Sequence, residues 1–194
     1  NSVESALAEA AMMTGMERNG DVVKFASYAP LFICFCHSQW TPDLIWFDAD
    51  KVIFTPNYYV QQLFSEYSGT ETLELNNQEK ELRKNGIYIS VVKNGNKKIL
   101  KVVNRNATEQ ELELNITGEA QVITLKAKNG MARIPAPTSA VDTSNGQKVI
   151  KAGVMSNAKL CELRSVEAST VDTQTVKLDG KILLPAKSFV VIKY

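Results

Sequence analysis

The chain has 194 residues, of which 44% are hydrophobic and 22% are charged, and its formal net charge is +1. This composition is typical of a globular protein with one domain, or one and a fraction, and it excludes disordered and collagen-like chains. A net charge near zero gives no reason to expect nucleic acid or an anionic membrane as a partner. No apolar run approaches the roughly 18–20 residues of a membrane-spanning helix.

The first elements along the chain are predicted to be helical. Residues 3–18 carry a wide, alanine-rich apolar stripe, Ser2 is a suitable N-cap, and Asn19-Gly20 is a suitable end. The segment therefore predicts a helix packed closely on a sheet. Asp21 can cap a second, short helical segment over residues 22–27.

An unbroken apolar run, LFICFC, follows Pro30 and covers residues 31–36. Its β-branched and aromatic residues predict a strand buried on both faces, as in a parallel sheet covered by helices. The pattern offers no parallel neighbour for this strand within the chain. The three cysteines, Cys34, Cys36 and Cys161, are interpreted as small buried hydrophobic residues, with neither a structural metal nor a disulfide framework.

The stretch after this strand is polar and aromatic, with His37, the only histidine, followed by Gln39, Trp40 and Asp43. Side chains at the carboxyl end of a parallel strand lie where α/β folds bind their ligands. Asp43 is interpreted as a turn-forming residue rather than a catalytic one. Extended segments are then expected over residues 44–48 and 51–54, and Thr55-Pro56 predicts the start of a helix that ends near residue 67.

From residue 70 onward apolar and polar residues alternate. Short alternating segments separated by turn residues predict an antiparallel sandwich, with hairpins at Asn94-Gly95-Asn96 and Asp179-Gly180. Residues 127–158 carry no regular pattern. The strands are expected over residues 72–75, 87–93, 98–104, 109–116, 121–126, 160–166, 173–178 and 188–194.

The two parts of the chain differ in chemistry, because twelve of the fifteen aromatic residues precede residue 69. We therefore expect two units, one over residues 1–68 and one over residues 69–194. The predicted fold class is mainly β: a C-terminal antiparallel, jelly-roll-like β-sandwich preceded by helix, strand and helix. Such a helix-strand-helix piece is one repeat of a larger α/β domain, so the chain has the pattern of the end of a longer protein.

Three stretches carry a family resemblance: ALAEAAMMTGMERNGDVVKFASYAPLF, HSQWTPDLIWFD and TPNYYVQQLFS. They resemble the C-terminal end of the α-L-arabinofuranosidases of glycoside hydrolase family 51, in the branch shared by gut bacteria and eukaryotes. The resemblance is dense over residues 3–67. It is weaker over residues 86–194, where GIYISVVKNGNKKILKVVNRNATEQELELNI and LLPAKSFVVIKY are similar to the family's terminal sandwich, and residues 127–170 depart from it.

The resemblance implies that residues 1–68 are the C-terminal piece of a (β/α)₈ catalytic barrel. Residues 31–36 would be its eighth strand, and residues 3–18 and 55–67 its last two helices. Enzymes of this family retain configuration, using one glutamate as acid/base and a second as nucleophile, with the two carboxyl groups about 5 Å apart. Both glutamates are expected upstream of Asn1. The chain is therefore expected to contain no catalytic residue and to be inactive alone.

The candidate substrate-binding residues are His37, Gln39 and Trp40. His37 is either a contact to a sugar hydroxyl, or to the glutamates, or a loop histidine bonded to the backbone. Trp40 either forms a wall of the sugar site or packs the loop on the barrel rim. Gln39 is a candidate ligand of a sugar hydroxyl.

The expected partners are an arabinose-containing carbohydrate, bound through the parent barrel, the upstream barrel segment and a second copy of the chain, with no cofactor, nucleic acid or membrane. The parent is expected to release terminal α-L-arabinofuranosyl residues from plant polysaccharides or oligosaccharides. The alternative is a non-catalytic carbohydrate-binding or structural β-sandwich module. The sequence leaves the compartment undetermined, and a periplasmic or extracellular location is compatible with it.

Overall fold

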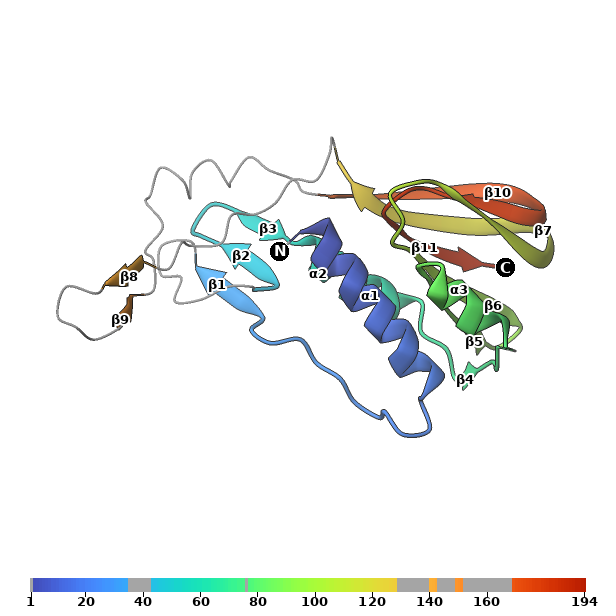
Figure 1. Cartoon of the computed structure of the whole chain (residues 1–194), viewed down its shortest axis with the longest axis horizontal. Helices are drawn as coiled ribbons and strands as arrows, with labels where there is room; N and C mark the ends of the chain where they lie inside the picture. The colour runs from blue at the N-terminus through green and yellow to red at the C-terminus, as the bar shows by residue number, and fades with distance from the viewer. Residues whose placement is uncertain (1, 35–42, 76, 129–139, 143–148, 152–168) are drawn as a thin grey trace.

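A computed structural model describes residues 2–34, 43–75, 77–128, 140–142, 149–151 and 169–194 (Figure 1). None of the helices within these ranges is long and apolar enough to cross a membrane. The elements in chain order are α1 (Val3–Arg18), β1 (Phe32–Cys34), β2 (Ile45–Phe47), β3 (Val52–Phe54), α2 (Pro56–Glu66), β4 (Glu71–Thr72), α3 (Gln78–Lys84), β5 (Ile87–Asn94), β6 (Lys97–Asn104), β7 (Gln110–Ala127), β8 (Ala140–Asp142), β9 (Val149–Lys151), β10 (Ser169–Leu184) and β11 (Ser188–Lys193).

Both long helices begin where local capping predicts. Ser2 accepts a hydrogen bond from the Ser5 N–H, and the Ser5 hydroxyl in turn accepts from the Ser2 N–H at 2.9 Å, so α1 begins with a capping box. Thr55 caps α2 through the Tyr58 N–H, with Pro56 in the first turn. These bonds satisfy N–H groups that a helix leaves without an internal partner.

The helices differ from the expectation in two places. Residues 22–27 form no helix; the Val22 and Val23 N–H groups donate to the Asn19 carbonyl at 3.0 and 2.8 Å, which closes a single turn. Helix α3 was not expected, because its sequence, QEKELRK, is short and polar and lacks an apolar stripe.

The first strands form a small three-stranded sheet in the order β1-β2-β3. Strand β1 pairs in parallel with β2, and β2 pairs antiparallel with β3. The expectation that β1 has no parallel neighbour in this chain was therefore wrong. Spatial pairing supplied the neighbour: the N–H of Ile45 donates to the carbonyl of Leu31 at 2.8 Å.

The larger sheet has six strands in the order β10-β7-β11-β6-β5-β4, all paired antiparallel. Strands β5 and β6 form the hairpin expected at residues 94–96, where Gly95 has a φ of +60° that suits glycine in a tight turn. The mainly β class, with a large antiparallel sheet after a helix-strand-helix segment, is confirmed.

Strands β7 and β10 differ from the expectation in length. Two strands were expected over residues 109–116 and 121–126, but the structure has the single strand β7 from Gln110 to Ala127, which continues through Gly118. Likewise, Asp179-Gly180 does not turn the chain: β10 continues through it with a shift of register between Asp179 and Lys181. Glycine-containing pairs in an alternating pattern indicate a bulge as readily as a hairpin.

The six-stranded sheet has an apolar core on each face, because its strands alternate. On one face, Val92, Ile99, Leu125 and Phe189 pack with residues of α1 and α2. On the other face, residues such as Val102 form a second core with apolar residues of β7 and β10. Figure 1 shows α1 and α2 between the small sheet and the large one. The division at residue 68 stays a prediction, and the first of these cores joins residues from both sides of it.

A buried polar network joins the end of α1 to the large sheet. Lys101 on β6 is fully buried; its Nζ donates to Glu17 Oε1 at 2.5 Å and to the Tyr67 carbonyl at 2.7 Å. Glu17 also accepts from the Ser90 hydroxyl at 2.7 Å. Burial lowers the pKa of Lys101, and the neighbouring Glu17 carboxylate partly offsets this. The network therefore holds an ion pair inside the interface between helix and sheet.

Replacing Gly69 by Ala is expected to lower the free energy of unfolding by about 1–3 kcal/mol, because the added methyl group overpacks the site. Its Cβ would lie 2.6 Å from Val92 Cβ and 2.7 Å from the Lys93 carbonyl oxygen. Gly15→Ala is the matched control: the nearest atom, on Arg18, is 3.8 Å away, and the change within α1 should raise stability by about 0.5–1 kcal/mol. Urea titrations measure both, and equal effects of one sign would contradict this prediction.

Candidate functional site

The candidate site lies around the small β1–β3 sheet. His37, Gln39 and Trp40 lie outside the residues that the structure describes, so their roles stay predictions. The structure describes the strand that leads to them, β1, and the strand that follows, β2. Because these two strands are parallel, their carboxyl ends, at Cys34 and Phe47, lie at the same edge of the sheet.

One face of the small sheet is apolar and exposed. Phe32, Phe47, Val52 and Phe54 share this face, and their side chains are 63%, 37%, 52% and 42% exposed. Phe32 and Phe47 make an edge-to-face contact with centroids 6.4 Å apart. We call this set the apolar face of the small sheet. The expectation that strand β1 is buried on both faces fails for this chain, since only the face that carries Ile33 is buried.

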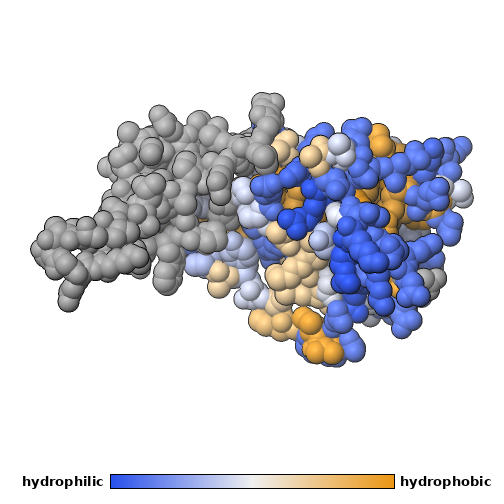
Figure 2. Space-filling view, viewed as in Figure 1, coloured by the Kyte–Doolittle hydropathy of each residue, from blue (hydrophilic) through white to orange (hydrophobic). Residues whose placement is uncertain are grey.

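The coil after α1 carries further exposed apolar side chains. Val22 and Phe25 are 75% and 87% exposed. In Figure 2 orange residues lie at the lower edge of the view, where this coil runs in Figure 1. A groove of about 610 Å³ lies between this coil and the helices; it is lined by Met13, Met16 and Phe64, among others. Large exposed apolar surface on a globular chain usually marks contact with another surface.

The two aspartates near the site have opposite environments. Asp48, at the carboxyl end of β2, accepts hydrogen bonds from the N–H groups of Asp50 and Lys51, each at 2.9 Å. Asp48 is therefore the turn-forming residue. Asp43, which was interpreted in that role, precedes Leu44, whose N–H donates to the Pro30 carbonyl at 3.2 Å. Asp43 is fully buried, and among the described residues its carboxylate has no hydrogen-bond partner.

Replacing Asp43 by Asn is expected to raise stability at pH 7. Burial raises the pKa of Asp43 above its ordinary value of 3.8. The folded chain therefore binds the proton more tightly than the unfolded chain, and stability falls as pH rises from about this value through the raised pKa. Urea titrations between pH 4 and pH 7 should show a shallower fall for Asp43→Asn than for the wild type.

Asp48→Asn is the control for this change, because it weakens two hydrogen bonds to the turn and should lower stability at pH 7. The interpretation of Asp43 fails if Asp43→Asn is the less stable of the two at that pH.

The acidic residues of α1 have hydrogen-bond partners on other elements of this chain. Glu9 accepts hydrogen bonds from the amides of Asn57 and Gln61 on α2, and burial raises its pKa. Glu4 accepts from Lys187 Nζ at 2.6 Å. Within the described ranges, no group of three His, Cys, Asp or Glu side chains is arranged to hold a metal ion. Cys34 is half-buried and free; Cys36 and Cys161 lie outside these ranges.

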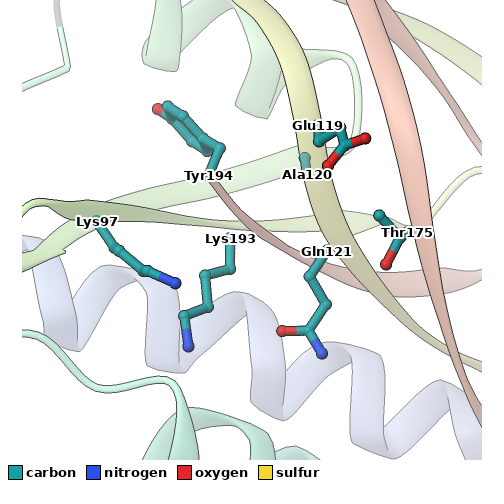
Figure 3. Close-up of a pocket in the computed structure, with 7 residues that line it drawn as sticks. All are labelled: Lys97, Glu119, Ala120, Gln121, Thr175, Lys193 and Tyr194. Carbon is teal, nitrogen blue, oxygen red and sulfur yellow. The ribbon is translucent and has the colours of Figure 1, made fainter.

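A second feature, which the sequence reasoning missed, lies on the large sheet. A pocket of about 230 Å³, drawn in Figure 3, lies where the start of β6 and the end of β11 meet the middle of β7 and β10. The alternating pattern carried a signal for this pocket. On β6 and on β11, a lysine takes a position on the face where other residues of the same strand form the core. The residues that line it are Lys97, Glu119, Ala120, Gln121, Thr175, Lys193 and Tyr194.

The fold is similar to that of solved α-L-arabinofuranosidases. The arabinose-bound MgGH51 α-L-arabinofuranosidase matches 99% of this chain with a TM-score of 0.69 and 26% identity, over 27% of its own length. The arabinose complex of the α-L-arabinofuranosidase from Thermotoga maritima matches 100% of this chain over 38% of its own length, with a TM-score of 0.64. Its identity of 16% supports likeness of fold alone.

The family model described as the α-L-arabinofuranosidase C-terminal domain matches residues 1–177, and the chain belongs to this family. Alpha-L-arabinofuranosidase 1 of Arabidopsis thaliana is 37% identical over 118 residues, which are 60% of this chain and 17% of that protein. The extracellular exo-alpha-L-arabinofuranosidase of Streptomyces chartreusis is 53% identical over 64 residues, 33% of this chain and 8% of that protein. The chain thus spans less than a fifth of these relatives.

Proposed function

We propose that this chain is the C-terminal portion of a retaining glycoside hydrolase that releases terminal α-L-arabinofuranosyl residues from plant polysaccharides or oligosaccharides. The catalytic glutamate pair would come from the upstream part of that polypeptide. Membership of the family supports the class of enzyme. The names of the relatives, which are α-L-arabinofuranosidases from a plant and a bacterium, support the substrate.

The observation that carries the proposal is the apolar face of the small sheet. Strand β1, the expected eighth barrel strand, lies at an edge of this sheet, whereas the strands of a (β/α)₈ barrel are covered on both faces. In this chain Phe32 is 63% exposed on that face. An upstream barrel segment would bury it. The site at the carboxyl ends of the strands would then include His37, Gln39 and Trp40 as the substrate-binding residues of this chain.

Complementation tests the proposal. The chain alone should not hydrolyse an aryl α-L-arabinofuranoside, and co-expression with its upstream segment should restore hydrolysis. Phe32→Lys should prevent this, because it places a charge at a contact that becomes buried. Leu183→Lys is the matched control, since Leu183 is 57% exposed on β10, away from the small sheet. Hydrolysis by the chain alone, or normal complementation by Phe32→Lys, would refute the proposal.

The alternative of a carbohydrate-binding module that stacks sugars on aromatic rings has no support from the large sheet. Tyr88 and Tyr194 are half-buried and Phe189 is buried. Self-association through the apolar face is also proposed for the isolated chain, and light scattering that shows a monomer would contradict it.

A further inference from the structure

The pocket of Figure 3 gathers polar side chains from four strands on one face of the large sheet. Lys193 on β11 stands opposite Gln121 on β7, and Gln121 stands opposite Thr175 on β10. Lys193 also stands opposite Ile99 on β6, and Lys97 lies two residues before Ile99, on the same face. In Figure 3 the side chains of Lys97, Lys193 and Gln121 extend to one side, while the Tyr194 ring points to the other.

The two lysines of this pocket differ from three lysines elsewhere on the sheet that are held in ion pairs. Lys93, Lys126 and Lys181 form ion pairs with Glu71, Asp172 and Glu111 at 3.5, 3.7 and 3.0 Å. In the described part of the chain, Lys97 and Lys193 form no ion pair. The Lys193 ammonium lies 5.9 Å from the centre of the Tyr67 ring, which restricts where it can point without neutralising its charge.

We propose that this pocket binds a carboxylate-bearing sugar, a uronic acid residue of an acidic polysaccharide. The ammonium groups of Lys97 and Lys193 would hold the carboxylate through charge-assisted hydrogen bonds. The Gln121 amide and the Thr175 hydroxyl each donate and accept hydrogen bonds, which suits the hydroxyl groups of a sugar ring.

Glu119 and the size of the pocket restrict the ligand further. A carboxylate at the rim accepts hydrogen bonds from sugar hydroxyls, but it repels a compact dianion such as inorganic phosphate. The volume of about 230 Å³ lies below the roughly 300–1,000 Å³ of sites for drug-sized ligands. One sugar residue fits this space better than a longer segment of polymer.

The pocket is separate from the proposed catalytic region. It lies beside the C-terminal end of β11, which is on the other side of α1 from the β1–β3 sheet in Figure 1. Its occupant would therefore be an acidic part of the polymer away from the bond that is cleaved. The choice of a carbohydrate rests on the proposed function, whereas the positive charge and the geometry of the pocket do not depend on it.

The test is calorimetric titration of the 194-residue chain with three probes: a short galacturonic acid oligomer, a neutral arabino-oligosaccharide and inorganic phosphate. The acidic oligomer should bind saturably, and binding should weaken as salt increases, because salt screens exposed charges. The other two probes should bind at least tenfold more weakly. Substitutions of Lys97 and Lys193 should leave thermal unfolding similar to that of the wild type, because Lys97 is exposed and Lys193 is half-buried.

The double variant Lys97→Gln with Lys193→Gln should weaken binding of the acidic oligomer at least tenfold. Lys98→Gln is the control, because Lys98 is the next residue on β6 and its side chain lies on the opposite face; its binding should be unchanged. Lack of saturable binding overturns the proposal, as does equal binding of neutral oligosaccharide or phosphate. So does a double variant that binds like the wild type, or an equal loss in Lys98→Gln.

Failure of this site and failure of the proposed function give different results. Hydrolysis of an uncharged aryl arabinofuranoside by the complemented enzyme does not require the pocket. Intact hydrolysis without binding of the acidic oligomer therefore rejects only the pocket. Binding of the oligomer without any hydrolysis after complementation rejects only the enzyme assignment.

Discussion

Replacing Glu17 by Ala is expected to lower the free energy of unfolding by about 3–5 kcal/mol, because it removes one partner of a buried ion pair. The Lys101 side chain is fully buried and the Glu17 side chain is 17% exposed. Without Glu17, the ammonium keeps the Tyr67 carbonyl as its hydrogen-bond partner but loses its counter-charge. Urea titration at pH 7 measures the loss.

The pH dependence of this variant separates loss of the ion pair from loss of packing. Burial lowers the pKa of Lys101 below 10.5 in the folded chain, so the folded chain loses the proton first. The protonation of Lys101 therefore lowers the free energy of unfolding as pH falls through the pKa of the folded chain. This loss is recovered as pH rises from that pKa toward 10.5. The deficit of Glu17→Ala should therefore shrink at alkaline pH. A deficit independent of pH would contradict the electrostatic explanation.

Glu81→Ala provides the control, because Glu81 and Lys84 form an ion pair at 2.7 Å whose side chains are 68% and 71% exposed. Solvent screens such a pair, and its loss should change stability by no more than about 1 kcal/mol. A loss as large as that of Glu17→Ala would show that burial is not the cause.

Phe189→Ala is expected to lower the free energy of unfolding by about 3–5 kcal/mol, through lost burial and the cavity that remains. Phe189 is fully buried on β11, and its ring stacks on Phe64 of α2 with centroids 5.2 Å apart. The substitution therefore weakens the core that joins the helices to the large sheet. Denaturant titration measures the loss, and Phe189→Leu should cost less because it keeps most of the volume.

A double-mutant cycle tests the stacking contact itself. Phe64→Ala and Phe189→Ala should be non-additive by about 0.5–1.5 kcal/mol, the coupling expected for an aromatic pair. Leu183→Ala, at a side chain that is 57% exposed, should change stability by no more than about 0.5 kcal/mol. Additive effects at Phe64 and Phe189 would mean that the rings contribute only through burial.

The elements that could be predicted from the sequence are those with local signals. Helix α1 has its cap at Ser2, α2 has Thr55 followed by proline, and the β5–β6 hairpin has Gly95 at its turn. Each signal acts within a few residues, so it is readable without knowing the fold. The family came from the resemblance over residues 3–67, and the match of the family model over residues 1–177 confirms it.

Other features could not be predicted because distant residues decide them. Whether the Gly180 region turns or bulges depends on β7, which pairs with β10 on both sides of it. The roles of Asp43 and Asp48 depend on whether backbone N–H groups reach their carboxylates. The Lys97–Lys193 pocket exists because β6 and β11 are neighbours in the sheet.

The sequence of this chain by itself is sufficient for α1, α2, the alternating pattern of the strands and the family, since these depend on caps, local periodicity and matching motifs. Tertiary structure decides which polar residues become partners. Lys101 and Glu17 are 84 positions apart, and only the packing of α1 on β6 buries them together. Tertiary structure also leaves Phe32 exposed on the small sheet, where apolar surface stays in water unless another surface covers it.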